Sequence, residues 1–147
     1  MTLQNIIDHI RNRSFMDGVS RDKSRVKATQ EVFTPTDYVI NCLIQYENDI
    51  KDPTKNFLDP SCGDGQFLGE VLIHKVQSGI DFETALSTIY GVDLMQDNID
   101  LCRERLLCGR EDLRHIVEKN IICANGLEYN YCFGEPEIFG NNLFQID

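Results

Sequence analysis

The stretch NFLDPSCGDGQFLGEVL, residues 56–72, decides the fold of this chain. It begins with an apolar pair, Phe57 and Leu58, and then reaches an acid, Asp59. Two glycines, Gly63 and Gly65, follow one residue apart, and apolar residues then recur with the period of a helix. The pattern predicts a short strand, a tight glycine turn and a helix that begins directly after the turn.

The rest of the chain alternates strands and helices in the same way. Strands are predicted at 88–94 and 120–124, and a last, weak strand is predicted within 135–147. Helices are predicted within 2–15, from residue 36 to about 49, and at 65–79, 81–87, 96–109 and 111–119. Strands that alternate with helices pair in parallel through helical crossovers. We therefore expect an α/β fold with a partial parallel sheet and an N-terminal helix.

Length and composition indicate one globular domain inside a cell. The chain has 147 residues, of which 41% are apolar. No stretch is long and apolar enough to cross a bilayer, and early charges argue against a signal peptide, so we expect a cytoplasmic protein without a membrane partner. The cysteines form no CxxC pair and have no histidine close by, which favours reduced thiols over a zinc site. They are Cys42, Cys62, Cys102, Cys108, Cys123 and Cys132.

The charge is divided unevenly along the chain. Six basic and three acidic side chains lie in the first 27 residues, a net charge of +3, whereas the whole chain carries −10. The remainder is therefore strongly acidic, and an acidic surface repels a nucleic-acid backbone. Any contact with nucleic acid is expected to use the basic N-terminal arm or a partner protein.

The N-terminal segment is expected to be distinct from the rest. Apolar residues from Leu3 to Ile10 share one helical face, with Thr2 as the cap, and residues 17–30 are polar and without periodicity. This divides the chain into an N-terminal helix with a basic linker, 1–30, and an α/β domain, 31–147. The apolar face of the helix is expected to pack on a second copy or on a partner.

The glycine turn has two interpretations. A G-x-G spacing at the end of a strand either makes a tight turn only or lets a ligand approach the backbone. Asp93 ends the next strand, where a carboxylate accepts hydrogen bonds from ribose hydroxyls, although it could also cap the following helix, for which Asp97 is better placed. Asp59 could face a cationic amine. Two acids without a lysine suit a ligand with a ribose and a positive charge, such as S-adenosylmethionine.

Several motifs together resemble the S-adenosylmethionine-dependent DNA adenine-N6 methyltransferases of restriction–modification systems. FLDPSCGDGQFL (57–68) is similar to the cofactor loop, EVFTP (31–35) to the opening motif, and YGVDL (90–94) to the ribose-binding motif. NIICANGL (120–127) matches a strand followed by an adenine-contacting acid, here Asn125. The resemblance implies a Rossmann-like class I methyltransferase fold. It implies cofactor contacts by Phe33, Thr34, Pro35, Asp59, Pro60, Ser61, Cys62, Gly63, Gly65, Phe67, Asp93, Leu94, Asn125 and Leu127.

The family's catalytic motif is Asn-Pro-Pro followed by Tyr or Phe. At about the right distance this chain has FGNNLFQ (139–145). It is either a degenerate form of the motif, which keeps Asn141 and Phe144 but replaces both prolines, or an unrelated stretch. In the family the base is flipped out of the duplex, and the aromatic ring stacks on it. The asparagine side-chain carbonyl and the backbone carbonyl of the next residue accept the two hydrogens of the adenine N6. Proline fixes the backbone of this turn. Without it, nothing in the sequence fixes the direction of the backbone carbonyl of Asn142, the residue after Asn141.

The resemblance implies either an active DNA methyltransferase or a cofactor-binding pseudoenzyme or regulatory subunit. The family sheet continues for three more strands, so a chain that stops at the fourth is expected to self-associate, as a homo-oligomer, or to join a partner subunit. Methyltransferases that act on RNA adenine and on glutamine amides carry related motifs, so the substrate class stays open. An α/β scaffold that binds no cofactor is the third alternative.

Overall fold

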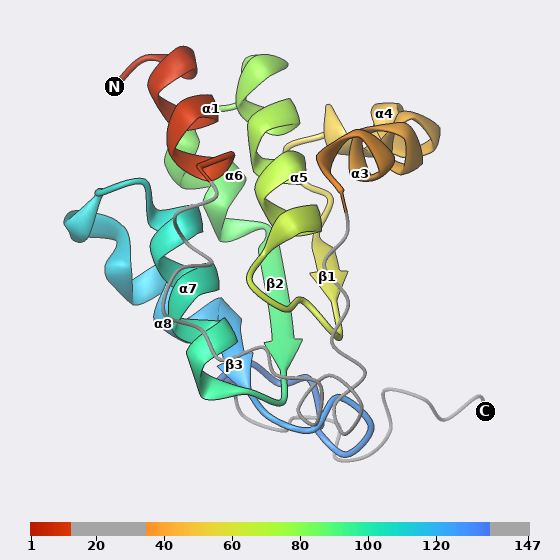
Figure 1. Cartoon of the computed structure of the whole chain (residues 1–147), viewed down its shortest axis with the longest axis vertical. Coiled ribbons are helices and arrows are strands. Elements are labelled where there is room, and N and C mark those ends of the chain that lie inside the picture. Colours follow the sequence, from red (N-terminus) through yellow and green to blue (C-terminus); the bar gives the residue numbers. More distant parts are fainter. Residues whose placement is uncertain (13–34, 136–147) are drawn as a thin grey trace.

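The computed structural model describes residues 1–12 and 35–135, which form an α/β fold around a parallel sheet (Figure 1). The strands are β1 (Phe57–Asp59), β2 (Ile89–Asp93) and β3 (Ile121–Cys123), in the order β1-β2-β3. Both pairs are parallel, with Phe57 opposite Ile89 and Gly91 opposite Ile121. The predicted α/β class and parallel pairing are confirmed for these three strands. The fourth predicted strand falls on residues that lie almost wholly outside the described part.

Helices appear where the sequence predicts them within the described residues. Gly79, with a φ of +104°, follows the end of α5, and Asp81 caps α6 by accepting a hydrogen bond from the Thr84 N–H at 3.0 Å. No helix in the described ranges has the length and apolarity that a bilayer crossing requires. The helical elements are α1 (Leu3–Ile10), α3 (Thr36–Leu43), η2 (Ile44–Tyr46), α4 (Glu47–Ile50), α5 (Gln66–Gln77), α6 (Phe82–Ser87), α7 (Gln96–Leu107), η3 (Glu111–Leu113) and α8 (Arg114–Asn120).

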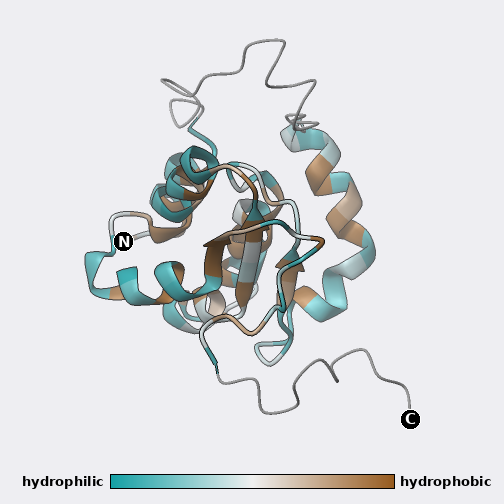
Figure 2. Cartoon of the chain, turned by 90° about the horizontal axis from the view of Figure 1, so that it is seen from below, coloured by the Kyte–Doolittle hydropathy of each residue, from teal (hydrophilic) through white to brown (hydrophobic). Residues whose placement is uncertain are grey.

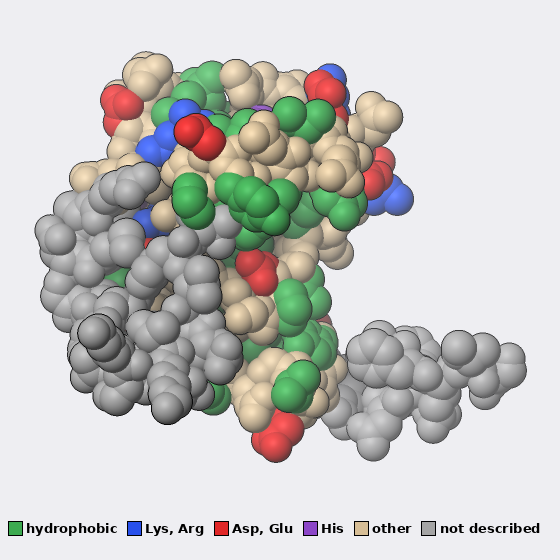
Figure 3. Space-filling model, turned by 45° about the vertical axis from the view of Figure 1, so that its right-hand side comes forward, with side chains coloured by type: hydrophobic (Ala, Val, Ile, Leu, Met, Phe, Trp, Pro, Cys, Tyr) green, Lys and Arg blue, Asp and Glu red, His purple; other side chains and the backbone are tan. Residues whose placement is uncertain are grey.

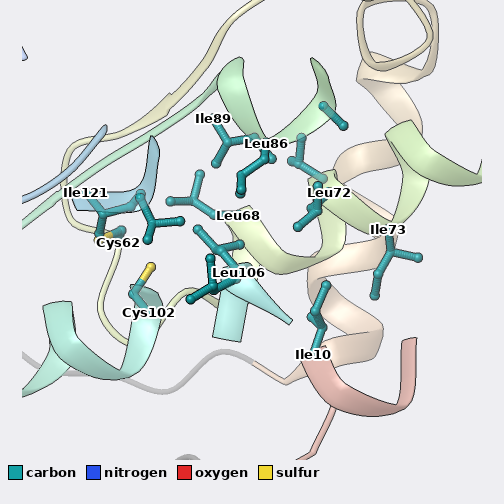
Figure 4. Close-up of a cluster of buried hydrophobic side chains, with 14 of the residues drawn as sticks. Ile10, Cys62, Leu68, Leu72, Ile73, Leu86, Ile89, Cys102, Leu106 and Ile121 are labelled. Carbon is teal, nitrogen blue, oxygen red and sulfur yellow. The ribbon is translucent and has the colours of Figure 1, made fainter. Parts of the chain in front are cut away.

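The hydrophobic core lies between one face of the sheet and the helices (Figure 4). Ile89 and Ile121 point into this core because alternate residues of a strand share a face. Leu68 of α5 packs so close to β2 that a Cβ at Gly91 would lie 2.7 Å from its Cδ1 atom. The absence of a side chain at Gly91 therefore lets α5 settle on the sheet.

The opposite face of the sheet is less fully covered. Leu58 and Tyr90 are paired in register on this face. The Tyr90 ring meets the Phe133 ring edge to face, with centroids 4.8 Å apart, so the segment after β3 covers the middle of the face. Leu58, on the β1 side, remains 48% exposed.

The N-terminal helix α1 packs on its own chain. Thr2 caps it as predicted, accepting from the Asn5 N–H at 3.1 Å, and Ile6 and Ile10 join the core against α5 and α7. Arg11 then forms two 2.9 Å hydrogen bonds to the buried carboxylate of Glu70 on α5. The expectation that a second copy or partner covers this face is wrong, because pairing between elements far apart in the chain leaves no local pattern.

The cap of α7 differs from the prediction. The helix begins at Gln96, so Asp97 lies in its first turn and not at the cap. The N-cap is Met95, which makes no side-chain cap hydrogen bond. Asp93 holds this end of the helix in another way, because its Oδ2 atom accepts hydrogen bonds from the Met95 N–H and from Nδ2 of Asn98, both at 3.0 Å. The helix therefore begins at Gln96 as predicted, and only the expected cap at Asp97 is wrong.

Candidate functional site

The carboxyl ends of all three strands meet at one edge of the sheet, at the bottom of Figure 1, and Figure 2 looks onto this edge. Backbone hydrogen bonds tie the loops there together. The Cys62 N–H donates to the Val92 carbonyl and the Ala124 N–H to the Asp93 carbonyl, both at 2.9 Å. Parallel α/β sheets bind their ligands at this edge, so it is the first place to look for a site.

The glycine turn needs both of its glycines for backbone reasons. Gly63 and Gly65 have φ values of +55° and +94°, which residues with a Cβ rarely adopt. A Cβ at Gly65 would also lie 2.8 Å from the Sγ atom of Cys102 on α7. A Cβ at Gly63 would meet nothing within 4 Å, so this part of the turn is open. The tight-turn interpretation thus holds at both positions, and Gly63 alone also leaves space for an approaching ligand.

The rear of the turn faces the core. The Asp64 carboxylate lies 3.5 Å from the guanidinium of Arg105 on α7, and the two side chains are only 3% and 2% exposed. Cys62 is buried as well and points toward Cys102 (Figure 4). The Cys62 side chain therefore belongs to the packing of the turn against α7, and only its backbone borders the open edge.

Asp93 connects the turn, β2 and α7. Its Oδ1 atom accepts a hydrogen bond from the Gly63 N–H at 3.1 Å, while Oδ2 accepts from Met95 and Asn98. An ionised carboxylate has about four lone-pair sites, so these three bonds leave about one acceptor site for a ligand. Asp93, which is predicted to bind a ribose, thus also holds the glycine turn and the start of α7 together.

Asp59 lies beside Asp93 at the end of β1. Its Oδ1 atom accepts a hydrogen bond from the Ser61 N–H at 3.0 Å, which closes a local turn. Burial raises the pKa of the Asp59 carboxyl above its usual value, and the nearby negative charge of Asp93 raises it further. A positive charge close to Asp59 would act in the opposite direction and favour the ionised form of its carboxyl.

The three loops enclose a pocket of about 380 Å³. Eight residues line it, and six of them belong to the predicted cofactor set: Pro60, Ser61, Asp93, Leu94, Asn125 and Leu127. Met95 and Gly126 complete the lining. Leu94 and Leu127 are 56% and 97% exposed, so the pocket has apolar side chains at its rim and a carboxylate beside them.

The loop after β3 is held against the glycine turn. A Cβ at Gly126 would lie 2.6 Å from the Pro60 carbonyl oxygen, so only glycine allows this approach. The Tyr131 hydroxyl donates a hydrogen bond to the Gly126 carbonyl. The Leu127 N–H donates to Oδ1 of Asn125 at 3.0 Å, which fixes the orientation of that side chain. The pocket wall formed by this loop is therefore braced on both sides.

A second hollow, of about 350 Å³, runs along the outer edge of β1 beneath α3. Asp59 and Phe67 line it together with Tyr46 and Leu58, and hydrophobic side chains gather on this side of the molecule (Figure 3). Pro35 directly precedes α3 as its N-cap. Of the predicted cofactor residues, six thus line the first pocket, and Asp59 and Phe67 line the second hollow. Pro35, Cys62, Gly63 and Gly65 line neither of the two. Phe33 and Thr34, and the predicted catalytic residues Asn141 and Phe144, lie outside the described residues.

Sequence reasoning missed three residues of the site. Met95 and Gly126 are direct neighbours of predicted residues, and the Asn-Gly pair at 125–126 is a turn signal that could have identified Gly126. Asn98 is 1% exposed and supports Asp93, yet a buried asparagine in the first turn of a helix has no sequence signature of its own.

Comparison with protein families and with solved structures gives no match from which to transfer a function. No protein-family model matches the chain, and no solved structure gives a significant match. Within residues 1–12 and 35–135, no three His, Cys, Asp or Glu side chains are grouped so that they could hold a metal ion. The function must therefore be argued from the pocket and from the sequence motifs.

Proposed function

We propose that this chain is an S-adenosylmethionine-binding protein of the DNA adenine-N6 methyltransferase type, with a partial Rossmann-like class I fold. The observation that carries the proposal is the convergence of six motif-predicted residues in one pocket. These residues come from three loops separated by about 30 residues each, so their meeting depends on the fold and not on sequence proximity. The pocket volume lies within the range of small-molecule sites.

The chemistry of the pocket supports a nucleoside with a cationic tail. Leu94 and Leu127 offer apolar contact to a flat base, and Asp93 keeps about one acceptor site for a ribose hydroxyl. Asp59 does not line this pocket but lies beside Asp93 in the neighbouring hollow along β1, and an ammonium that reached it would favour the ionised form of its carboxyl. When bound, S-adenosylmethionine would supply a methyl group activated by the adjoining sulfonium.

Isothermal titration of the whole chain with S-adenosylhomocysteine tests this proposal. We expect one binding site per chain, and we expect adenosine alone to bind more weakly because it lacks the amino group that Asp59 favours. Absence of heat and of thermal stabilisation at millimolar ligand would favour the alternative of an α/β scaffold without a cofactor.

The second candidate function is a cofactor-binding subunit or pseudoenzyme without chemistry of its own. It is favoured by the sequence Asn141-Asn142-Leu143-Phe144, which lacks both prolines of the catalytic motif, and by the acidic charge. Transfer of radiolabelled methyl groups to adenine-rich DNA distinguishes the two candidates. Under the second candidate the purified chain transfers no label, and nucleic acid is contacted through the basic N-terminal arm or a partner. Labelling that disappears in Asn141→Ala would identify an active enzyme.

A further inference from the structure

A third hollow, of about 380 Å³, lies where α3, η2 and α4 pack beside the last turns of α5 (Figure 1). We call it the α3–α5 pocket. Helix α5 begins after Gly65 and is about 18 Å long, so this pocket lies at the opposite end of the helix from the glycine turn. It shares no lining residue with the pocket at the carboxyl ends of the strands. The lining consists of Ile40, Leu43, Ile44, Glu47, Ile50, Lys51, His74, Gln77 and Ser78.

The apolar part of the lining extends from the core to the surface. Leu43 and Ile50 are only 7% and 3% exposed, whereas Ile44 is 64% exposed. Small-molecule sites are typically concave and apolar, with a few polar groups that select the ligand. The volume and the lining of the α3–α5 pocket both fit this description. Its polar groups therefore indicate which class of molecule it accepts.

His74 and Ser78 present hydrogen-bond acceptors. Nδ1 of His74 lies 2.6 Å from the Glu70 carbonyl oxygen, and because that oxygen only accepts, Nδ1 carries the proton. In the neutral imidazole Nε2 is then an acceptor, and it has no partner among the described residues. The Ser78 hydroxyl donates to the Lys75 carbonyl at 2.7 Å, which leaves its oxygen as an acceptor. A ligand with a donor is therefore complementary to this part of the lining.

The two ionised side chains that line the pocket are paired with each other. The Lys51 ammonium lies 2.8 Å from Oε1 of Glu47. Since opposite charges already meet there, the lining offers no unbalanced charge that would attract an ion. Gln77 adds one donor and one acceptor group, so it does not change the excess of acceptors. The pocket thus fits a neutral ligand whose polar group donates.

We infer that the α3–α5 pocket binds small neutral apolar molecules that carry one hydrogen-bond donor, and that Nε2 of His74 accepts from this donor. The inference does not depend on the proposed function, because the two pockets have no residue in common. Indole is a simple probe of this class, with a flat apolar ring and a single N–H. 1-Methylindole keeps the ring but lacks the donor.

Fluorescence titration of indole with the whole chain tests the inference, because the chain contains no tryptophan and the probe can be excited selectively. We expect a saturable blue shift with a dissociation constant of about 1 mM or lower, and about threefold or more weaker binding of 1-methylindole. In His74→Leu the two probes should bind equally, because the acceptor is removed. His115→Leu is the matched control, since His115 is exposed on α8 and does not line the pocket; it should keep the wild-type ratio.

A second variant keeps the test decisive if His74→Leu does not fold. Ile44 is largely exposed, so Ile44→Asp should leave the fold intact while it removes apolar contact and adds a charge beside the ligand. We expect it to weaken the binding of both probes by about threefold or more. Four results would overturn the inference: no saturable shift in the wild type, equal affinities of the two probes there, an unchanged ratio in folded His74→Leu, or unchanged affinities in Ile44→Asp.

Discussion

The front and the rear of the glycine turn differ in what they contact. At the rear, Asp64 pairs with Arg105 inside the core, and Gly65 lies against Cys102. At the front, the Gly63 N–H bonds to Asp93 beside the open pocket. One short motif thus separates the residues that hold the fold from those that border the open pocket. Changes at the rear should chiefly alter stability, and changes at the front should chiefly alter binding.

The largest effect is expected at the rear, from Arg105→Leu. This change leaves the Asp64 carboxylate buried without its cation, and breaking such a pair costs about 3–5 kcal/mol of unfolding free energy. Urea unfolding followed by circular dichroism measures the loss. Arg110→Leu is the control, since Arg110 pairs with Asp112 at the surface and its removal should change stability little. Similar losses in both variants would contradict a special role for the buried pair.

The next largest effects on the unfolding free energy are expected when either glycine of the turn is replaced by alanine. Gly65→Ala combines a φ of +94° with a clash against Cys102, so we expect a loss of about 2–4 kcal/mol. Gly63→Ala has only the backbone penalty and should lose about 1–2 kcal/mol. Urea unfolding again gives both values. In a Cys102→Ala background the cost of Gly65→Ala should fall toward that of Gly63→Ala; equal costs in both backgrounds would show that the clash is relieved elsewhere.

A smaller effect of opposite sign is expected at the front, from Asp59→Asn. Because the folded state raises the Asp59 pKa above its unfolded value, the folded state binds the proton more tightly, and ionised Asp59 destabilises it. The asparagine variant keeps the acceptor for Ser61 and removes the charge, so it should be more stable than wild type at pH 7. This gain should shrink as the pH falls through the folded pKa. Unfolding at several pH values checks it, and a variant less stable at pH 7 would contradict the sign.

Much of this division was predictable from the sequence. Which acidic side chains pair with arginines in the core and which border the pocket was not. Local periodicity indicates the strand, turn and helix around Gly63 and Gly65, and the alternation of elements brings Asp93 and Asn125 to the same sheet edge. The partners of Asp64 and Glu70 could not be predicted, because they are arginines on α7 and directly after α1. The contacts of Asp93 with the start of α7 were missed for a related reason: Asp93 belongs to a strand, whereas residues that hold a helix start are sought directly before the helix.

The most direct test of the pocket is the affinity of Asp93→Ala for S-adenosylhomocysteine, measured by isothermal titration beside Asp81→Ala. Both changes remove an aspartate that accepts backbone hydrogen bonds near a helix start, but only Asp93 lines the pocket. We predict that Asp93→Ala weakens binding by about 1–3 kcal/mol at a temperature where both variants are folded, while Asp81→Ala binds as wild type does. Equal affinity in the two variants would contradict the assignment of this pocket as the cofactor site.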